Sequence, residues 1–175
     1  MIYEKDGKQQ EFTMENYPWQ DSTWQFVDSK SKLVQKGNAE PAIKDFILND
    51  ENMNDQTQNI LTAPGYTFFL FVKDPENART DNMETLRKLM AKASKLNIPF
   101  YVLSSGNKEA TDAFKEQNKL YPADYLIVDA TANKTAMRSN PGLMLLKDGV
   151  IQHKWSFRDY PKDISLNNGS LNLVK

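Results

Sequence analysis

Cysteine and histidine, the side chains that most often carry redox, metal and nucleophilic chemistry, are almost missing from this sequence. Among 175 residues there is no cysteine and one histidine, His153. The absence of thiols excludes dithiol exchange, disulfides, thiolate metal sites and a cysteine nucleophile. One imidazole cannot build a histidine-rich metal centre, and the acidic stretch 49–55 lacks the central glycine and distal glutamate of a calcium loop. We therefore expect neither a metal nor a cofactor.

A hydrolytic site would need a nucleophile next to a base. Ser104 and Ser105 end one apolar run and His153 lies in another, so a Ser-His-Asp arrangement is conceivable, although no Gly-x-Ser-x-Gly turn is present. His153 alternates with Ile151 and Trp155, which is typical of one face of a strand. A lone histidine in that position is more often a packed or solvent-facing residue than a base, so an enzyme with non-thiol chemistry is only an alternative hypothesis.

The stretch RSNPG contains the best candidate binding groups. Pro141 cannot donate a backbone hydrogen bond and Asn140 before it is biased toward extended geometry, so the backbone of Asn140 is predicted to be free for an outside peptide. Gly142 has no side chain and permits close approach. Arg138, which Ser139 separates from Asn140, is the best candidate to bind a carboxylate or another anion. A turn would equally explain Pro141, and a surface salt bridge would equally explain Arg138.

Hydrophobic periodicity predicts the elements that position these groups. Apolar runs without polar alternation are typical of strands buried on both faces, and a 3.6-residue period is typical of helices. Strand, helix and strand in succession form a right-handed parallel crossover, and Asp-Gly between apolar runs predicts a hairpin. We expect a strand at 66–74, a helix at 81–97, a strand at 98–105, a helix at 107–120, a strand at 124–130, a helical turn at 131–139, and strands at 143–147 and 150–155 flanking Asp148-Gly149.

Three domain-level segments are predicted around this pattern. Residues 1–63 form an N-terminal extension with a β-hairpin at Asp6-Gly7, a strand within 23–29 and a short helix before Pro64. Residues 64–160 form the α/β core. Residues 161–175 are rich in Asn, Asp and Ser and are predicted to be an irregular tail.

The order strand-helix-strand-helix-strand-helix-strand-strand, with a proline before the last hairpin, resembles the thioredoxin fold. The fold class expected is thus α/β and thioredoxin-like, with a central mixed sheet flanked by helices and an N-terminal β-rich extension. In that fold a cis-proline lies beside the loop that opens the first core helix, and both segments form the binding groove. The resemblance implies a groove between 74–81 and 138–142, with these candidate residues: Asp74, Arg79, Arg138, Ser139, Asn140 and Pro141.

Redox-active members of that fold carry a Cys-x-x-Cys motif where the first core helix begins. The matching stretch here, residues 73–84, contains no thiol. Asp81 is expected to cap the helix in its place. The resemblance therefore predicts a fold whose usual redox centre is empty.

A narrower resemblance covers most of the chain. Residues 129–156, DATANKTAMRSNPGLMLLKDGVIQHKWS, resemble the C-terminal domain of DoxX-family membrane proteins from Bacteroidetes, most specifically at RSNPG and KWS. The stretches YEKDGKQQEFTMENYP and STWQFVDSKSKLVQKG also resemble that family, and the match is looser between 49 and 65. In such proteins a multi-helix membrane region precedes this domain. The resemblance implies a chain that is soluble as given, at the periplasmic face of the inner membrane, and is either a segment of a longer protein or a member without the membrane part.

The function we expect is non-catalytic binding of a peptide or envelope protein partner, by addition of a strand beside Asn140. Contact with the membrane would come only through the missing N-terminal region. A formal net charge of -1 argues against a nucleic-acid partner. A purely structural domain that assembles the attached membrane protein, and an enzyme using Ser105, His153 or a carboxylate, are the alternatives.

Overall fold

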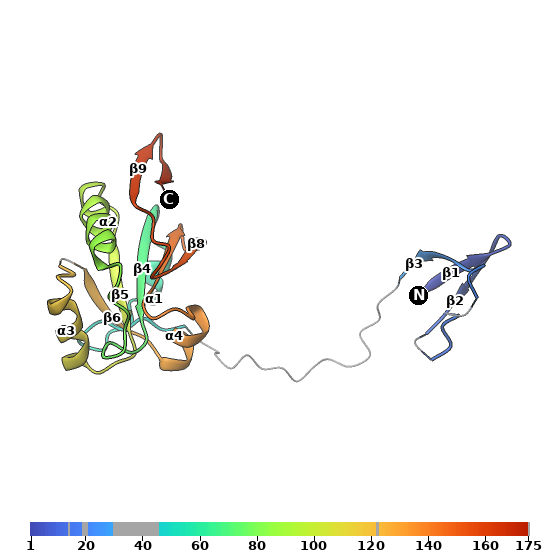
Figure 1. The fold of residues 1–175 in the computed structure, drawn as a ribbon, viewed down its shortest axis with the longest axis horizontal. Helices are drawn as coiled ribbons and strands as arrows, with labels where there is room; N and C mark the ends of the chain where they lie inside the picture. Colours follow the sequence, from blue (N-terminus) through green and yellow to red (C-terminus); the bar gives the residue numbers. More distant parts are fainter. Residues whose placement is uncertain (14, 19–20, 30–45, 122, 175) are drawn as a thin grey trace. The chain divides into compact units, whose positions relative to one another are not determined.

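The chain forms two compact units, Met1–Glu40 and Pro41–Lys175. The structure is a computed structural model that describes residues 1–174 except 14, 19–20, 30–45 and 122 (Figure 1). No helix among these described residues combines the length and the apolar character that a membrane span requires. The two units are described separately below.

The first unit is a small antiparallel sheet with the order β2-β1-β3. Its strands are β1 (Ile2–Lys5), β2 (Lys8–Glu11) and β3 (Gln25–Asp28). The hairpin predicted at Asp6-Gly7 is confirmed, because both residues have the positive φ of a primed turn, 51° and 74°. The Tyr3 ring packs edge-on against Phe12 and Phe26, with ring centroids 5.9 and 5.5 Å away. Aromatic contacts thus supply the apolar packing of this short-stranded sheet.

The second unit is built on a five-stranded mixed sheet with the order β6-β5-β4-β7-β8. Strands β4, β5 and β6 are parallel, while β7 is antiparallel to β4 and β8 to β7. This order and these connections confirm the thioredoxin-like fold predicted from the sequence. The elements in chain order are α1 (Thr57–Leu61), β4 (Tyr66–Val72), α2 (Met83–Lys95), β5 (Phe100–Ser104), α3 (Lys108–Gln117), β6 (Asp124–Ile127), α4 (Ala130–Ala136), β7 (Gly142–Lys147) and β8 (Val150–Ser156).

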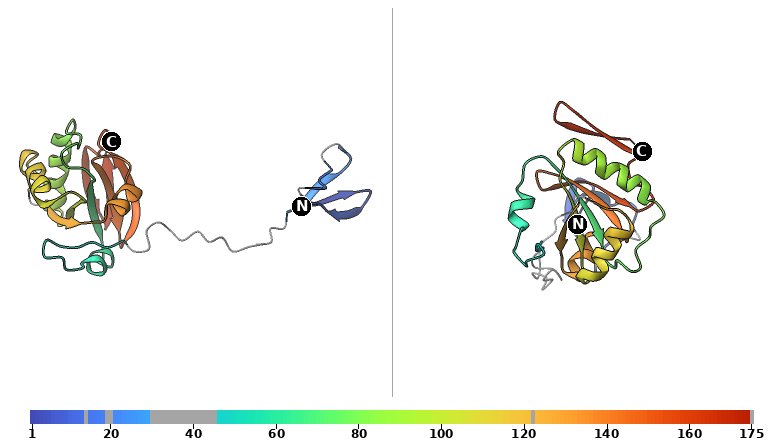
Figure 2. Two further views of the ribbon diagram at one scale, coloured as in Figure 1. Left: turned by 90° about the horizontal axis from the view of Figure 1, so that it is seen from below. Right: turned by 90° about the vertical axis from the view of Figure 1, so that its left-hand side faces the viewer.

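Two separate cores cover the two faces of this sheet because β4 is buried on both sides. Phe68 and Leu70 pack in one core with residues of α2 and α3. Figure 2 shows the ribbon of these two helices beside the sheet. Phe69 and Phe71 pack in the other with Ala132 of α4 and with the segment that precedes α1. In that segment Leu48 is fully buried, and Asn49 makes a backbone bridge to Ile127 at the end of β6. The run without alternation at 66–72 therefore correctly predicts a strand covered on both faces.

The C-terminal segment is ordered, and the prediction of an irregular tail was wrong. It forms an antiparallel hairpin of β9 (Asp163–Asn167) and β10 (Ser170–Val174). Ile164 is fully buried against the α2 core, and Leu171 and Leu173 of β10 pack on the same core. The many Asn and Ser residues obscured this alternation, which places one apolar side chain at every second position.

Candidate functional site

The loop after β4 and the loop before β7 are joined through Asn140. The peptide bond between Asn140 and Pro141 is cis. The Asn140 side chain accepts a hydrogen bond from the Lys73 amide at 3.0 Å and donates one to the Asp74 carbonyl at 2.8 Å. The Arg79 amide donates to the Asn140 carbonyl at 3.0 Å. The two segments that the sequence placed on either side of a groove therefore lie in direct contact.

These contacts change how a partner could use the groove. An added strand beside Asn140 would need its carbonyl oxygen as an acceptor, and the Arg79 amide already occupies that position. Gly142 does not leave open space either, because a Cβ at this residue would lie 2.3 Å from Cγ of Met137. Strand addition at Asn140 would thus have to displace a segment of the same chain.

Asp81 does not cap α2, which corrects the sequence prediction. The N-cap residue is Asn82, and its side chain makes no capping hydrogen bond. Asp81 instead accepts two hydrogen bonds of 2.8 Å from the Arg79 guanidinium, which lowers the pKa of this carboxyl. A two-point charge-assisted pair fixes both side chains, so the competing guanidinium explains why the carboxylate does not turn to the helix.

The remaining groove candidates differ in whether their polar side chains are already hydrogen-bonded within the protein. Asp74 accepts hydrogen bonds from the Asn77 side chain and amide at 2.9 and 3.1 Å, which lower the pKa of its carboxyl. The Ser139 hydroxyl donates to the Pro141 carbonyl at 2.6 Å and stabilises the turn. The Arg138 carbonyl accepts from the Lys73 ammonium, whereas its exposed guanidinium makes no hydrogen bond or ion pair to any described residue. Arg138 is therefore the most available of these charged groups.

A polar pocket of about 510 Å³ opens directly beside Asn140. It lies at the carboxyl ends of the parallel strands, the edge at which open α/β sheets bind ligands. Its walls come from the loops after β4 and β5 and from the starts of α3 and α4. The lining residues are Lys73, Asp74, Pro75, Glu76, Ser105, Gly106, Asn107, Ala110, Ala130, Lys134 and Asn140.

The chemistry of this pocket suits neutral polar groups. Two lysines and two acidic residues line it, so neither charge predominates. Both helix starts are capped: the Asn107 side chain accepts from the Ala110 amide at 2.8 Å, and Asp129 accepts from the amides of Thr131 and Ala132 at 2.8 and 3.0 Å. These caps consume the amides that would otherwise attract an anion. Peptide groups, which both donate and accept, match such a surface.

The sequence missed most of these pocket residues. The sequence indicates Ser105 only as a possible nucleophile, and no motif in it points to Asn107 or Lys134 as pocket residues. The usable signal was topological, because loops that follow neighbouring parallel strands meet at one edge of the sheet. Asn107, three residues before Ala110, also has the spacing of a helix N-cap.

The structure does not bring the candidate catalytic residues together. Ser104 is buried and hydrogen-bonds Thr111 at 3.0 Å, and Ser105 donates to the Lys73 carbonyl at 3.0 Å. His153 lies on β8, where its ring stacks on Trp155 with centroids 5.3 Å apart. In the sheet, β4 and β7 lie between the serine-bearing strand β5 and β8. Ser105 and His153 therefore cannot act as a nucleophile and base pair in this arrangement.

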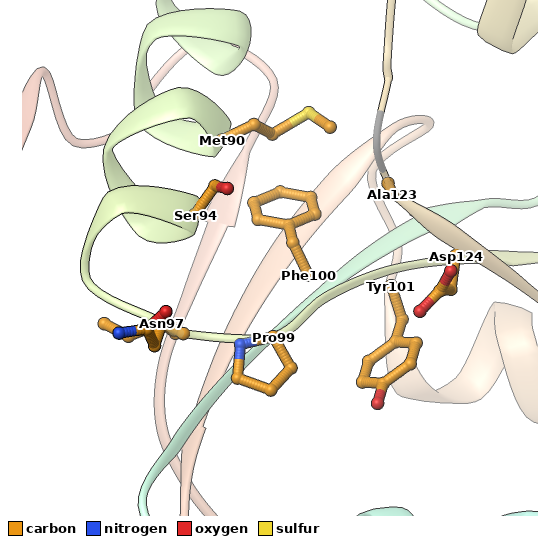
Figure 3. A pocket seen from close by; sticks show the side chains of 9 residues that line it. Met90, Ser94, Asn97, Pro99, Phe100, Tyr101, Ala123 and Asp124 are labelled. Carbon is orange, nitrogen blue, oxygen red and sulfur yellow. The ribbon is translucent and has the colours of Figure 1, made fainter.

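A different pocket, of about 400 Å³, lies at the opposite end of the sheet, where β5 begins. Figure 3 shows Phe100 and Tyr101 pointing to opposite sides of the strand, with Asp124 beside Tyr101. Burial, and to a smaller extent the Asp124 charge, raise the pKa of the Tyr101 hydroxyl. None of the groove residues predicted from the sequence contributes to this pocket.

The fold and the empty redox position define a thioredoxin-like domain without thiols. A protein-family model described as a domain of unknown function, DUF8463, matches residues 1–36. A search of curated proteins finds no match. The fold assignment rests on the strand order, the connections and the position of the proline.

Solved structures similar to this chain include three redox proteins from Bacteroides. A thiol:disulfide interchange protein from Bacteroides sp. has 16% identity and a TM-score of 0.49, covering 62% of this chain and 75% of its own. The thioredoxin domain of a thiol-disulfide oxidoreductase from Bacteroides vulgatus has 16% identity and a TM-score of 0.48, with coverages of 67% and 89%. A thiol-disulfide oxidoreductase from Bacteroides fragilis has 19% identity and a TM-score of 0.47, with coverages of 62% and 85%. Thiol redox activity does not transfer to this chain, which has no cysteine.

Proposed function

We propose that this protein is a redox-inactive, thioredoxin-like binding module that holds a peptide segment of an envelope protein partner. The partner would enter the polar pocket beside Asn140. The RSNPG and KWS resemblance supports attachment to a DoxX-type membrane protein and a periplasmic location. The domain would then act as the soluble arm of a membrane assembly.

The observation that carries this proposal is the pocket at the carboxyl ends of β4 and β5, with Asn140 at its rim. The side chain of Asn140 fixes the backbone of Lys73 and Asp74, so this rim is held by hydrogen bonds on both sides. A rigid rim lowers the conformational entropy that a site loses on binding. The exposed Arg138 guanidinium lies on the neighbouring loop and can bind an acidic side chain or the carboxylate end of the same peptide.

A purely structural module is the alternative, and one observation favours it. Because the Arg79 amide occupies the Asn140 carbonyl, the groove is already closed by the protein's own loop. Under this reading the pocket has no occupant and the domain only supports the attached protein. The two hypotheses make opposite predictions about peptide selection.

The test is selection of displayed random peptides on the full chain, followed by amide NMR with a selected peptide. Binding should shift the amide signals of Ser105, Gly106 and Asn107. Ala130→Arg fills the pocket and should abolish binding, whereas Thr131→Arg places the same side chain on the next, exposed position of α4 and should not. Failure to select any peptide, or equal effects of the two variants, would favour the structural module.

Attachment to a membrane protein needs its own test. The coding frame upstream of Ile2 should encode membrane-spanning segments, and fractionation of cells that express the natural gene should place the domain with the envelope. A cytoplasmic product without such segments would refute this part of the proposal and leave the peptide-binding part standing.

A further inference from the structure

A third pocket, of about 390 Å³, lies where α2 begins. One wall is the first turn of α2, with Asn82 and Thr85. The other is the segment between β8 and β9, which contributes Phe157, Arg158, Tyr160 and Lys162. The pocket is separate from the one beside Asn140, because the two share no lining residue.

The start of α2 leaves its main-chain donors without a side-chain cap. Asn82 is the N-cap residue and makes no capping hydrogen bond. The first turns of α3 and α4 are capped by Asn107 and Asp129. A helix of this length carries partial positive charge at its start, and uncapped amides there bind anions. The uncapped start of α2 is not a binding site by itself, so the side chains that face it must also favour an anion.

Two of those side chains are unpaired cations. Arg158 and Lys162 line the pocket and form no ion pair with any described residue. On the opposite wall, Asp81 lies beside the start of α2 and is neutralised by its bidentate pair with Arg79. Glu84 in the first turn of α2 pairs with Lys88 at 2.7 Å and is not part of the lining. Of the nearby acids, Asp159 accepts a hydrogen bond from the Ser156 hydroxyl and is not part of the lining. Asp163 pairs with Lys92 at 3.3 Å. The pocket therefore has an excess of positive charge.

Aromatic contacts hold the arginines in place. The guanidinium of Arg158 lies 5.2 Å from the centroid of the Phe157 ring, and that of Arg79 lies 5.3 Å from the same ring. Cation–π contacts at this distance are attractive and restrict the long side chain. Arg158 also contributes, after Arg79, to lowering the pKa of Asp81, so its charge reaches the start of the helix.

Tyr160 supplies an unused donor. It lines the pocket although only 4% of its surface is exposed, and its hydroxyl has no hydrogen-bond partner among the described residues. Burial raises the pKa of this phenol, so the hydroxyl stays protonated and can donate. A buried hydroxyl without a partner is costly, which makes an acceptor from a ligand favourable.

We propose that this pocket binds a phosphate group, either as free phosphate or as the phosphoryl group of a lipid headgroup. Two cations balance the charge of about -1.5 to -2 that a phosphate monoester carries. The first-turn amides of α2, the Thr85 hydroxyl and the Tyr160 hydroxyl supply donors for its oxygens. A tetrahedral group with several acceptor oxygens can use donors that approach from both walls at once, which a planar carboxylate cannot do equally well.

Calorimetric titration of the full chain with inorganic phosphate tests the proposal. We expect saturable binding that weakens by about tenfold or more in Arg158→Gln and in Lys162→Gln, since hydrogen bonds to charged groups are strong. Lys95→Gln, at the other end of α2, removes the same charge outside the pocket and should leave the affinity unchanged. Tyr160→Phe removes only the hydroxyl that lacks a partner, so it should weaken phosphate binding without lowering the unfolding temperature.

Vesicles of phosphatidylcholine with and without phosphatidic acid distinguish the two sources. Arg158-dependent binding to the phosphatidic acid vesicles identifies a lipid headgroup. Phosphate binding without vesicle binding identifies a free or small-molecule phosphate. The proposal is overturned if phosphate does not bind saturably, or if Arg158→Gln and Lys162→Gln bind it like the unmodified chain while circular dichroism shows that they fold.

Discussion

The main-chain amide of Arg79 donates a 3.0 Å hydrogen bond to the carbonyl oxygen of Asn140, which belongs to the cis peptide bond with Pro141. The loop before α2 therefore covers the backbone that the sequence predicted to be free. The same loop is held by the Asn140 side chain at its other end. The accessible polar surface is therefore not the backbone of Asn140 but the neighbouring pocket, where the loops after β4 and β5 meet.

Replacing Asn140 with Ala should lower the free energy of unfolding of the Pro41–Lys175 unit by about 1 to 3 kcal/mol, because its side chain joins two loops through several hydrogen bonds. Urea titration followed by the amide NMR signals of β4 and β7 measures this loss. Arg138→Ala is the control, and as an exposed substitution it should change stability by less than about 0.5 kcal/mol. Equal stability of both variants would show that the Asn140 contacts are not formed in solution.

Replacing Gly142 with Ala should destabilise the same unit by about 1 to 3 kcal/mol through overpacking. The new Cβ would lie 2.3 and 2.5 Å from Cγ and Sδ of Met137, which is buried. Shortening Met137 to Ala removes the clash but leaves its own cavity. The double variant should therefore lose less stability than the sum of the two single variants, and strict additivity would contradict the predicted contact.

Gly149→Ala and Gly169→Ala form a matched pair. Both glycines end a hairpin turn with nearly equal φ, 75° and 76°. An alanine Cβ at Gly149 would lie 2.2 Å from the Leu61 carbonyl oxygen, whereas at Gly169 no atom lies within 4 Å. Both variants carry the backbone strain of about 1 to 2 kcal/mol for a positive φ, and only Gly149→Ala adds a clash with backbone. Thermal unfolding should therefore show the larger loss for Gly149→Ala; equal losses would argue against the packing of α1 on this turn.

The acid stability of the second unit should depend on Asp129. Hydrogen bonds from the amides of Ala132 and Thr131 lower the pKa of this carboxyl in the folded protein. Because the folded pKa is lowered, the ionised carboxylate stabilises the fold, and this contribution is complete above the unfolded pKa of about 3.9. The contribution is lost as the pH falls through the lower pKa of the folded protein. In Asp129→Asn that contribution is absent, so the stability difference between the two proteins should shrink as pH is lowered. A constant difference across the acid range would show that the carboxylate charge does not stabilise α4.

Local patterns were reliable wherever neighbouring residues determine the structure. The turns at Asp6-Gly7 and Asp148-Gly149 adopt the positive φ values that such dipeptides favour. The uninterrupted apolar run of β4 correctly indicated burial on both faces. The C-terminal hairpin was missed because its apolar residues, among them Ile164, are spaced between polar ones and needed the surface of α2 to bury them.

The candidate site was predictable only in part. The meeting of the two loops followed from the resemblance to a known fold, whereas the binding of an anion by Arg138 stays a prediction. The pairing of Asp81 with Arg79, and of Asn140 with Lys73 and Asp74, could not be read from the chain. Each depends on which of several polar partners lies within about 3 Å, a distance that sequence separation does not encode.

The residue types alone rule out thiol chemistry and predict a mixed α/β sheet, because composition and hydrophobic period act over a few residues. The tertiary fold alone determines which backbone groups remain free, and it places Arg158, Tyr160 and Lys162 opposite the start of α2. These three residues reach α2 because the segment after β8 packs against that helix, which lies more than 60 residues earlier in the chain. Long-range packing of this kind is a property of the whole sheet, so no local pattern around Tyr160 could reveal it.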